Sequence, residues 1–298
     1  MRIVFASGKG GAGKTTVTAS LAALWPRPVV AVDCDVEAPN LHLFLSPELP
    51  TRRAVTLDVP LLIPGKCTAC GACKDICQYR AIARFGKKVL IFPDMCHGCG
   101  GCFAVCRESA LDTAKRELGV LEEGFFTAAG IKRPFIMGRT RIGEAMTPPL
   151  LRELLTTLDV MLAGNDSDAL LDSPPGVSCP AMTVAGRADM VVLVAEPTPF
   201  GFHDFKLAHA AFSRSGARLG VVMNRSGMDG NEAGDAELHA WCAERQLPLL
   251  AELPFDRAAA EQYAGGGLIA GTSPAWEARF RALAESILRE AGQGGTHA

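Results

Sequence analysis

The sequence predicts an α/β protein with a doubly wound, mostly parallel sheet that is interrupted by a cysteine-rich insertion. Three observations predict this class. Short apolar runs that suit buried strands alternate with segments of helical periodicity near both ends of the 298-residue chain. A glycine-rich loop joins the first apolar run to the first helical segment. In the region between residues 61 and 112 the periodicity stops and cysteines gather.

The first strand–helix–strand unit can be read in order along the chain. Residues 2–6 are an apolar run that predicts a strand, and residues 15–24 place alanine, leucine and valine at helical spacing. Pro26 ends that helix, and residues 28–32 predict a second buried strand. A strand, a loop, a helix and a strand in this order indicate a βαβ unit with parallel strands.

Alternation of strands and helices resumes after the insertion. Residues 119–140 alternate like a hairpin or a pair of edge strands. The further strands expected are 169–172, 190–195, 219–224 and 248–253, and the further helices are 149–158, 179–186, 202–213, 231–245, 258–263 and 274–291. In the last helix Trp276, Phe280, Leu283 and Ile287 share one face, which predicts packing against the sheet. We therefore expect one phosphate-loop domain in two parts, residues 1–60 and 113–298, with residues 61–112 inserted.

Charge and hydropathy exclude several classes of protein. The formal net charge of −2 does not favour nucleic acid as a partner. The apolar runs are too short for stable membrane insertion. Residues 1–11 lack the pattern of a signal peptide, so we expect a cytoplasmic protein whose thiols stay reduced.

Eight of the eleven cysteines form two copies of the pattern C-x2-C-x2-C-x3-C. The first run is Cys67, Cys70, Cys73 and Cys77, and the second is Cys96, Cys99, Cys102 and Cys106. Bacterial two-cluster ferredoxins hold two [4Fe–4S] clusters with this spacing, and the fourth cysteine of each run binds the other cluster. The pattern thus predicts one set of Cys67, Cys70, Cys73 and Cys106 and another of Cys96, Cys99, Cys102 and Cys77. Structural zinc is the competing interpretation, since zinc sites also use C-x2-C pairs.

The insertion departs from the ferredoxin pattern at one point. Gln78 and Arg107 stand where a proline usually follows the fourth cysteine. The change removes no ligand, and it bears on the exposure and potential of the clusters.

Residues 8–15 satisfy the phosphate-loop pattern G-x4-G-K-[ST] between a strand and a helix. Lys14 is expected to reach the β- and γ-phosphates, Thr15 to bind Mg²⁺ and Thr16 to lie near the α-phosphate. The backbone N–H groups of the loop should surround the phosphate oxygens. The loop residues that we assign to nucleotide binding are Gly10, Gly11, Ala12, Gly13, Lys14, Thr15 and Thr16.

A second acidic segment follows the strand predicted at residues 169–172. Asp172 could hold Mg²⁺ through water, and the N–H group of Gly176 could contact the γ-phosphate. An ordinary turn is the alternative, since aspartate, serine, proline and glycine are turn residues. The phosphate loop elsewhere in the chain favours the first interpretation.

Together these segments resemble the MinD/Mrp group of ATPases, which are relatives of the nitrogenase iron protein. Residues 9–16 (KGGAGKTT) resemble the deviant phosphate loop of that group, residues 33–41 (DCDVEAPNL) its switch I, and residues 172–176 (DSPPG) its switch II. Residues 196–198 and 254–256 resemble later segments. The inserted two-cluster ferredoxin domain marks a known subgroup.

The resemblance implies roles that spacing alone does not show. Lys9 would cross a dimer interface to the partner's nucleotide, although a solvated loop lysine is the alternative. Asp35 would position the attacking water, and Asp33 would support Mg²⁺ indirectly. Asn224 would contact adenine, and Pro254 would also lie against the nucleotide. Lys9, Lys14, Asp35 and Asp172 are therefore our candidate catalytic residues.

The leading hypothesis is a Mg²⁺-dependent ATPase that couples ATP binding and hydrolysis to two [4Fe–4S] clusters, for gated electron transfer. Its partners would be a second copy or a paralogous ATPase, forming a homodimer or heterodimer, and a redox or iron–sulfur acceptor protein. The alternatives are an iron–sulfur cluster carrier or assembly scaffold, and a redox-sensing regulatory ATPase like MinD.

Three cysteines lie outside the two runs. Cys34 and Cys242 are expected to be buried packing residues. Cys179 follows switch II, where the nitrogenase iron protein has a cluster ligand. Packing is the favoured role for Cys179, and a bridging cluster is the alternative.

Overall fold

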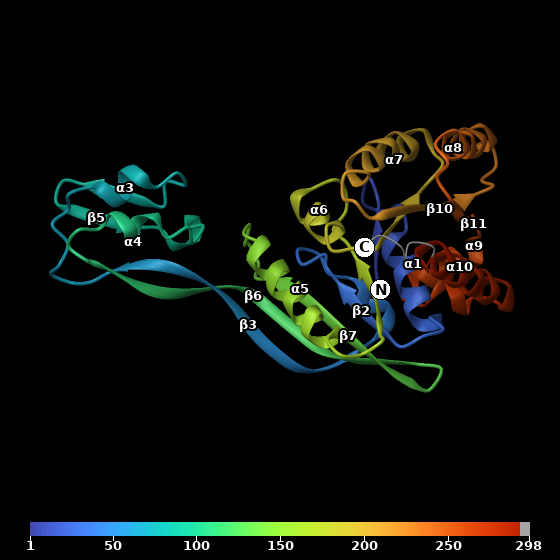
Figure 1. Ribbon diagram of the computed structural model, residues 1–298, viewed down its shortest axis with the longest axis horizontal. Coiled ribbons are helices and arrows are strands. Elements are labelled where there is room, and N and C mark those ends of the chain that lie inside the picture. The colour runs from blue at the N-terminus through green and yellow to red at the C-terminus, as the bar shows by residue number, and fades with distance from the viewer. Residues whose placement is uncertain (293–298) are drawn as a thin grey trace.

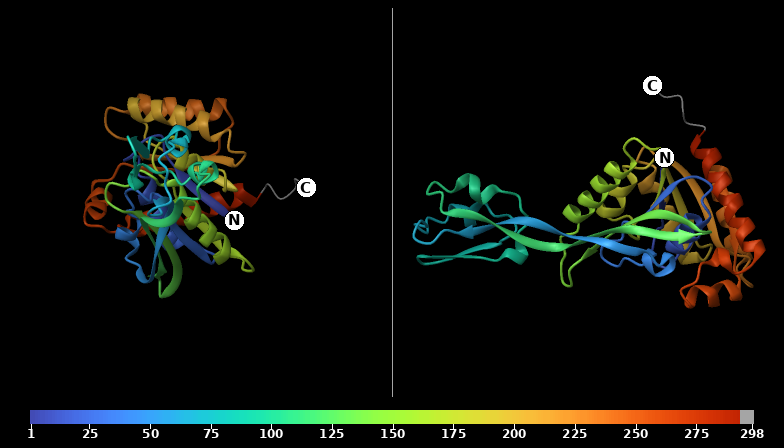
Figure 2. Two further views of the ribbon diagram at one scale, coloured as in Figure 1. Left: turned by 90° about the vertical axis from the view of Figure 1, so that its left-hand side faces the viewer. Right: turned by 90° about the horizontal axis from the view of Figure 1, so that it is seen from below.

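The computed structural model describes residues 1–292 and shows an elongated molecule with two parts (Figure 1). The larger part is a sheet with helices on both faces. Two long strands leave its edge and carry a small cysteine-rich lobe at their far end, as Figure 2 also shows from two other sides. The lobe therefore stands away from the body of the sheet.

The main sheet has nine strands in the order β11, β10, β9, β1, β8, β2, β7, β6, β3. Neighbours from β11 to β7 are parallel, whereas β6 pairs antiparallel with both β7 and β3. The strands are β1 (Arg2–Ala6), β2 (Val29–Asp33), β3 (Glu48–Leu62), β6 (Leu111–Ala128), β7 (Ile131–Thr140), β8 (Asp168–Asp172), β9 (Met190–Ala195), β10 (Arg218–Ser226) and β11 (Leu249–Pro254). The predicted α/β class with a large, mostly parallel sheet is confirmed.

Central strands of this sheet are apolar along their whole length because helices cover both of their faces. Every residue of β2, β8 and β9 is buried. Their side chains enter two separate cores, one on each face of the sheet.

Helices cover both faces of the sheet in two layers (Figure 1). One layer consists of α1 (Lys14–Leu24), α2 (Leu41–Leu45), α9 (Arg257–Ala264) and α10 (Pro274–Gly292), together with the short 3-10 helix η2 (Ile269–Gly271). The other consists of α5 (Pro148–Leu162), α6 (Cys179–Ala185), α7 (Pro199–Phe212) and α8 (Glu232–Glu244). The predicted inner face of α10 is confirmed, since Trp276, Phe280, Leu283 and Ile287 are all buried.

The sequence-based prediction missed helix α2 and strand β3, which lie between β2 and the lobe. Few of the fifteen residues of β3 are buried, and apolar and polar residues alternate clearly only over residues 55–59, a short signal that the prediction missed. The predicted hairpin at residues 119–140 exists as β6 and β7, but β6 begins at Leu111.

Short elements fill the lobe between β3 and β6, where the sequence had suggested little regular structure. They are α3 (Ala72–Ile76), β4 (Ile82–Phe85), β5 (Lys88–Ile91), the 3-10 helix η1 (Pro93–Met95) and α4 (Gly101–Val105). Strands β4 and β5 form a separate antiparallel pair. Elements of three to five residues are too short to show periodicity, which explains why the sequence did not predict them.

Candidate functional site

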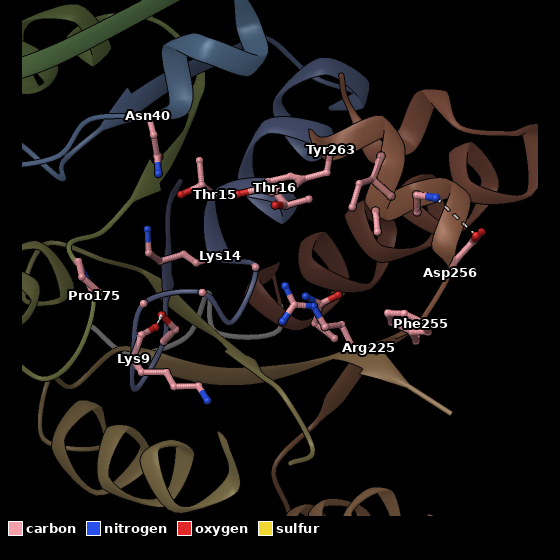
Figure 3. A pocket seen from close by; sticks show the side chains of 18 of the residues that line it. Lys9, Lys14, Thr15, Thr16, Asn40, Pro175, Arg225, Phe255, Asp256 and Tyr263 are labelled. Atoms are coloured by element: carbon pink, nitrogen blue, oxygen red, sulfur yellow. Dashed lines mark hydrogen bonds between the residues drawn. The ribbon is translucent and has the colours of Figure 1, made fainter. Parts of the chain in front are cut away.

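A cleft of about 230 Å³ opens beyond the carboxyl ends of β1 and its neighbours, over the loop between β1 and α1 (Figure 3). In open α/β sheets this is the edge at which ligands bind. Most of the predicted site residues lie around it. Those that line the cleft are Lys9, Gly10, Gly11, Gly13, Lys14, Thr15, Thr16, Asp35, Asn224 and Pro254.

The glycine loop is shaped by left-handed backbone at two positions. Gly11 has φ of 85° and Gly13, which precedes α1, has φ of 95°. A side chain at Gly13 would collide with the amide of Asn224. That amide donates a 2.9 Å hydrogen bond from Nδ2 to the carbonyl oxygen of Ala12. Ala12 thus supports the loop from behind and does not line the cleft.

Asp172 lies fully buried beneath the loop and holds the two side chains that were predicted to meet phosphate and metal. Lys14 Nζ lies 2.7 Å from one carboxylate oxygen of Asp172. The Thr15 hydroxyl donates to the other oxygen at 2.6 Å. Charged hydrogen bonds of this kind are strong, and burial protects them from water. The lysine and the hydroxyl are therefore held in place at the floor of the cleft.

Asp33 and Asp35 belong to the segment that follows β2. Asp33 accepts hydrogen bonds from the backbone N–H groups of Asp35 at 3.1 Å and of Asn40 and Leu41 at 2.9 Å. Burial and the neighbouring Asp172 carboxylate raise the pKa of Asp33 to about 7. Burial also raises the pKa of Asp35, which lines the cleft. Asp33 is thus a structural anchor for this segment, whereas Asp35 faces the ligand space.

Gly176 does not line the cleft. Its N–H group donates to the carbonyl oxygen of Ser7 at 3.0 Å. Pro175, its neighbour, does line the cleft. The predicted phosphate contact of Gly176 would therefore require this segment to move.

Lys9 is engaged within its own chain. Its Nζ lies 3.6 Å from one carboxylate oxygen of Glu196, and Arg225 Nη1 lies 3.1 Å from the other. Figure 3 shows the Lys9 side chain pointing away from Lys14. The two lysines of the loop therefore have different surroundings, one buried on Asp172 and one half-exposed beside Glu196.

The structure adds cleft residues that the sequence-based assignment missed. Asn40 points toward Lys14 and Thr15 in Figure 3, and its side-chain oxygen Oδ1 is buried with no hydrogen-bond partner among residues 1–292. Arg225, Phe255 and Tyr263 line the opposite side with Trp276. Asn40 and Phe255 lie inside the segments 33–41 and 254–256 that resemble the ATPase family, so the sequence could have identified them as cleft residues. Trp276 was assigned only to the core.

Eight cysteines of the lobe surround two cavities in the sets that the spacing predicts. One cavity is lined by Cys67, Cys70, Cys73 and Cys106 and lies beside Leu62 and Leu111 at the end of the two long strands. The other, of about 280 Å³, is lined by Cys77, Cys96, Cys99 and Cys102 and lies beside Asp58 and Pro60. Asp58 and Pro60 precede Leu62 along β3. We therefore call the cavity beside Asp58 and Pro60 the proximal cavity, and the cavity beside Leu62 the distal cavity.

Both cavities are built by the same backbone pattern. Ala69 and Gly98 have positive φ, and so do Gly71 and Gly100, at equivalent positions of the two cysteine runs. The N–H groups of Ala69 and Gly98 each donate to a cysteine sulfur at 3.4 Å, that of Cys67 and that of Cys96. Hydrogen bonds to sulfur are one means by which proteins tune iron–sulfur clusters.

No group of three or more His, Cys, Asp or Glu side chains within residues 1–292 is arranged to hold a metal ion. Ligands of a single ion converge on one point at bond distance. Ligands of a four-iron cluster are instead spread around its corners. Four cysteines line each cavity, which is the number of ligands that such a cluster takes, although the distal cavity is only about 20 Å³.

Two of the three remaining cysteines are buried and one is exposed. Cys34 and Cys242 are buried, as predicted. Cys179 is exposed at the start of α6, so the packing role favoured for it was wrong. Helix α6 begins where Ser178 accepts a hydrogen bond from Ala181, which leaves Cys179 on the surface.

A glycine loop at a strand–helix junction, a buried lysine–aspartate pair and a cleft at the carboxyl edge of the sheet define a nucleotide-binding phosphate-loop protein. The chain belongs to the CobQ/CobB/MinD/ParA nucleotide-binding domain family, which matches residues 3–269. It is thus an ATP-binding protein of the MinD/ParA type, a class of phosphate-loop ATPases.

The chain is also similar to other sequences and, in fold, to solved structures. Two uncharacterized proteins of Methanocaldococcus jannaschii are similar: MJ0578 is 34% identical, over 77% of this chain and 79% of its own length, and MJ0579 is 28% identical, over 78% and 83%. The septum site-determining protein MinD from Pyrococcus horikoshii, in complex with Mg-ADP, has the same fold with a TM-score of 0.57 at 21% identity, covering 99% of both chains. The cell division ATPase MinD from Pyrococcus furiosus aligns with a TM-score of 0.55.

None of the helices within residues 1–292 is long and apolar enough to cross a membrane.

Proposed function

We propose that this protein is a Mg²⁺-dependent ATPase of the deviant phosphate-loop type that couples its nucleotide state to two [4Fe–4S] clusters, for gated electron transfer to an acceptor protein. In this proposal residues 61–112 are an inserted ferredoxin-like domain, and residues 1–60 and 113–298 form the ATPase domain. Eleven cysteines, all free in the structure, suit a reducing compartment such as the cytoplasm.

One observation carries the proposal. The eight cysteines that the spacing singles out line two cavities in the crossed sets of two-cluster ferredoxins, in the same chain as the nucleotide cleft. Cys106 joins the first three cysteines of the first run, and Cys77 joins those of the second. When bound, such clusters accept and donate single electrons.

The cleft residues have distinct tasks in ATP hydrolysis. Lys14 neutralises charge on the β- and γ-phosphates, and Thr15 with Asp172 would hold Mg²⁺. Asp35 positions a water molecule whose oxygen bonds to the γ-phosphorus as the bond to the ADP oxygen breaks. The proton of that water passes to Asp35 or to the released phosphate. Catalysis in this class rests mainly on positioning and electrostatic stabilisation.

Lys9 has a role only if two chains meet. We propose that ATP draws Lys9 away from Glu196 and across a dimer interface to the partner's phosphates. The second chain is another copy or a paralogue. The presence of two similar proteins in Methanocaldococcus jannaschii shows that one organism can encode two chains of this kind.

A comparison of two lysine variants tests the ATPase part of the proposal. Lys14→Ala should lose ATP binding, because its ammonium group contacts the phosphates directly. Lys9→Ala should still bind ATP as a monomer but should neither dimerise nor hydrolyse ATP. Equilibrium dialysis, light scattering and phosphate release measure the three properties. Normal ATP-dependent dimerisation of Lys9→Ala would remove the role proposed for Lys9.

Anaerobic purification tests the iron–sulfur part. We expect about eight iron atoms per chain, as two four-iron clusters require, and an EPR signal of the reduced protein that changes with Mg-ATP. Cys102→Ser should halve the iron, and Cys242→Ser, which alters a buried cysteine outside both cavities, should leave it unchanged. Transfer of clusters to an apo-acceptor would favour a cluster carrier instead. ATP-dependent partner binding without either effect would favour a redox-sensing regulator.

A further inference from the structure

Arg116 on β6 joins the long two-stranded ribbon to the loop that carries Cys96. Its Nη2 donates to the carbonyl oxygen of Cys96 at 3.1 Å, and its Nη1 lies 3.4 Å from the carbonyl oxygen of Asp94. The side chain is only 6% exposed. A buried guanidinium group therefore holds the backbone of Asp94 and of Cys96, a cysteine of the proximal cavity.

The charge of Arg116 is balanced from the ATPase side of the molecule. Glu144, in the segment after β7, accepts from Arg116 Nη1 at 2.8 Å, and its side chain is 2% exposed. Arg141 also pairs with Glu144, at 3.3 Å, and with Asp94 of the lobe. Breaking a buried ion pair leaves an uncompensated charge. The Arg116–Glu144 pair therefore resists separation of the lobe from the segment after β7.

The same segment is bonded to the residue that follows Asp35. Thr140 donates to the carbonyl oxygen of Val36 through its N–H group at 2.9 Å and through its hydroxyl group at 3.3 Å. The N–H group of Arg141 donates to Leu118 on β6 at 2.9 Å. Val36 is buried, whereas Asp35 beside it lines the nucleotide cleft.

We propose that Arg116, held by Glu144, is a positioning residue that links the switch I segment to the cysteines of the proximal cavity. The inference rests on the proposed function for its consequence, since the linked cysteines are proposed ligands. Movement of Asp35 and Val36 on ATP binding is transmitted through Thr140 and the Arg116–Glu144 pair to the Cys96 loop. Within residues 1–292 the side-chain hydrogen bonds of Arg116 and Glu144 reach Cys96 of the proximal cavity and no cysteine of the distal one.

Each cavity has an arginine bonded to a cysteine carbonyl oxygen, exposed Arg84 at Cys70 of the distal cavity and buried Arg116 at Cys96 of the proximal cavity. A buried cation near a cluster stabilises its reduced, more negative form and raises its potential. Arg116 should do so for the proximal cluster only. Arg107 serves as a matched control, because it is an exposed arginine of the same lobe that follows Cys106, a cysteine of the distal cavity.

The test measures the midpoint potentials of both clusters by EPR-monitored titration of iron-loaded protein, with and without Mg-ATP. In the wild type we expect ATP to shift one of the two potentials. Arg116→Gln should lower that potential in the absence of nucleotide and abolish its response to ATP, with ATP binding unchanged. Arg116→Lys should keep the charge and lose the response, because one ammonium group cannot replace the forked contacts. Arg107→Gln should retain the response.

A second readout does not require iron. Amide hydrogen exchange of residues 94–99 should change on ATP binding in the wild type and stay constant in Arg116→Gln and in Glu144→Gln. Wild-type responses in both variants would overturn the link, even if the clusters are present. An Arg116-dependent exchange response in a protein that binds no iron would keep the link and refute the proposed function. If Arg116→Gln does not fold, the hydrogen-exchange response of Glu144→Gln still tests the link.

Discussion

At the scale of single residues, two buried carboxyl groups lie close together beneath the nucleotide cleft. Asp33 and Asp172 occupy paired positions on neighbouring strands, and Lys14 is the cation between them and the cleft. Burial and the second carboxylate favour the protonated form of Asp33. A site of this kind gains from a divalent cation, since the cation allows both carboxylates to ionise.

This charge balance predicts proton release on ligand binding. The pKa of Asp33 is about 7 in the nucleotide-free protein and should fall when Mg-ATP binds. Preformed Mg-ATP should then release protons at about pH 6.5, and its affinity should rise with pH until Asp33 is ionised. At about pH 8.5 the release should vanish, because the carboxyl group has already lost its proton. Calorimetric titration in two buffers of different ionisation enthalpy measures the release, and equal heats near pH 6.5 would contradict it.

At the scale of elements, the last helix α10 closes the core on one face of the sheet. Its buried stripe packs in the same core as residues of α1 and β11. The aromatic side chain of Trp276 also reaches the nucleotide cleft and donates to Asp256 at 2.7 Å. Helix packing and the shape of the cleft are therefore connected.

Truncation of the α10 stripe should destabilise the fold. Phe280 is fully buried, so Phe280→Ala should lower the free energy of unfolding by about 3–5 kcal/mol. Phe200, which is 81% exposed at the start of α7, provides the matched control. Phe200→Ala should change the free energy of unfolding of the monomer by no more than about 0.5 kcal/mol. Urea unfolding at fixed pH compares the two, and equal losses would show that α10 does not pack as described.

The ribbon of β3 and β6 is the element that separates the two parts. It pairs residue by residue from Glu48 with Phe125 to Leu62 with Leu111. Gly119 and Gly124 lie where a side chain would collide with the backbone of a neighbouring strand. Because glycine has no side chain, the neighbouring strands can approach closely at these two positions, which lie near the register shifts of the ribbon.

At the scale of the whole molecule, a nucleotide-binding body and a cysteine-rich lobe are joined mainly by that ribbon. Leu62 and Leu111 face each other at its end, and the N–H group of Ile63 donates to the carbonyl oxygen of Ala110 at 2.9 Å. A chain that enters and leaves a lobe at adjacent points can be shortened there without breaking the sheet.

Removal of the lobe should separate the two activities. Replacing residues 64–109 with Asn-Gly provides a two-residue hairpin between β3 and β6. The shortened protein should bind ATP with wild-type affinity and bind no iron. Gel filtration, ATP binding and iron analysis test this, and Cys102→Ser in the full chain serves as the comparison. Loss of ATP binding in a folded shortened protein would show that the lobe is part of the nucleotide site.

Local patterns in the sequence predicted much of this molecule. The strand at Arg2–Ala6 and the strand at Met190–Ala195 match their predicted bounds, because buried parallel strands are continuous apolar runs. Glycine spacing located the loop, and cysteine spacing located both cavities. Such signals are short-range, so neighbouring residues are sufficient to show them.

The tertiary structure alone decided which distant segments meet. It brought Arg225, Phe255 and Tyr263 to the side of the cleft opposite Asn40, and it placed Arg116 between Glu144 and Cys96. It also revealed β3, whose apolar alternation over residues 55–59 is short compared with the fifteen residues of the strand. The physical reason is that strand order and register set these contacts, and they arise from the packing of the whole chain rather than from any local stretch of residues.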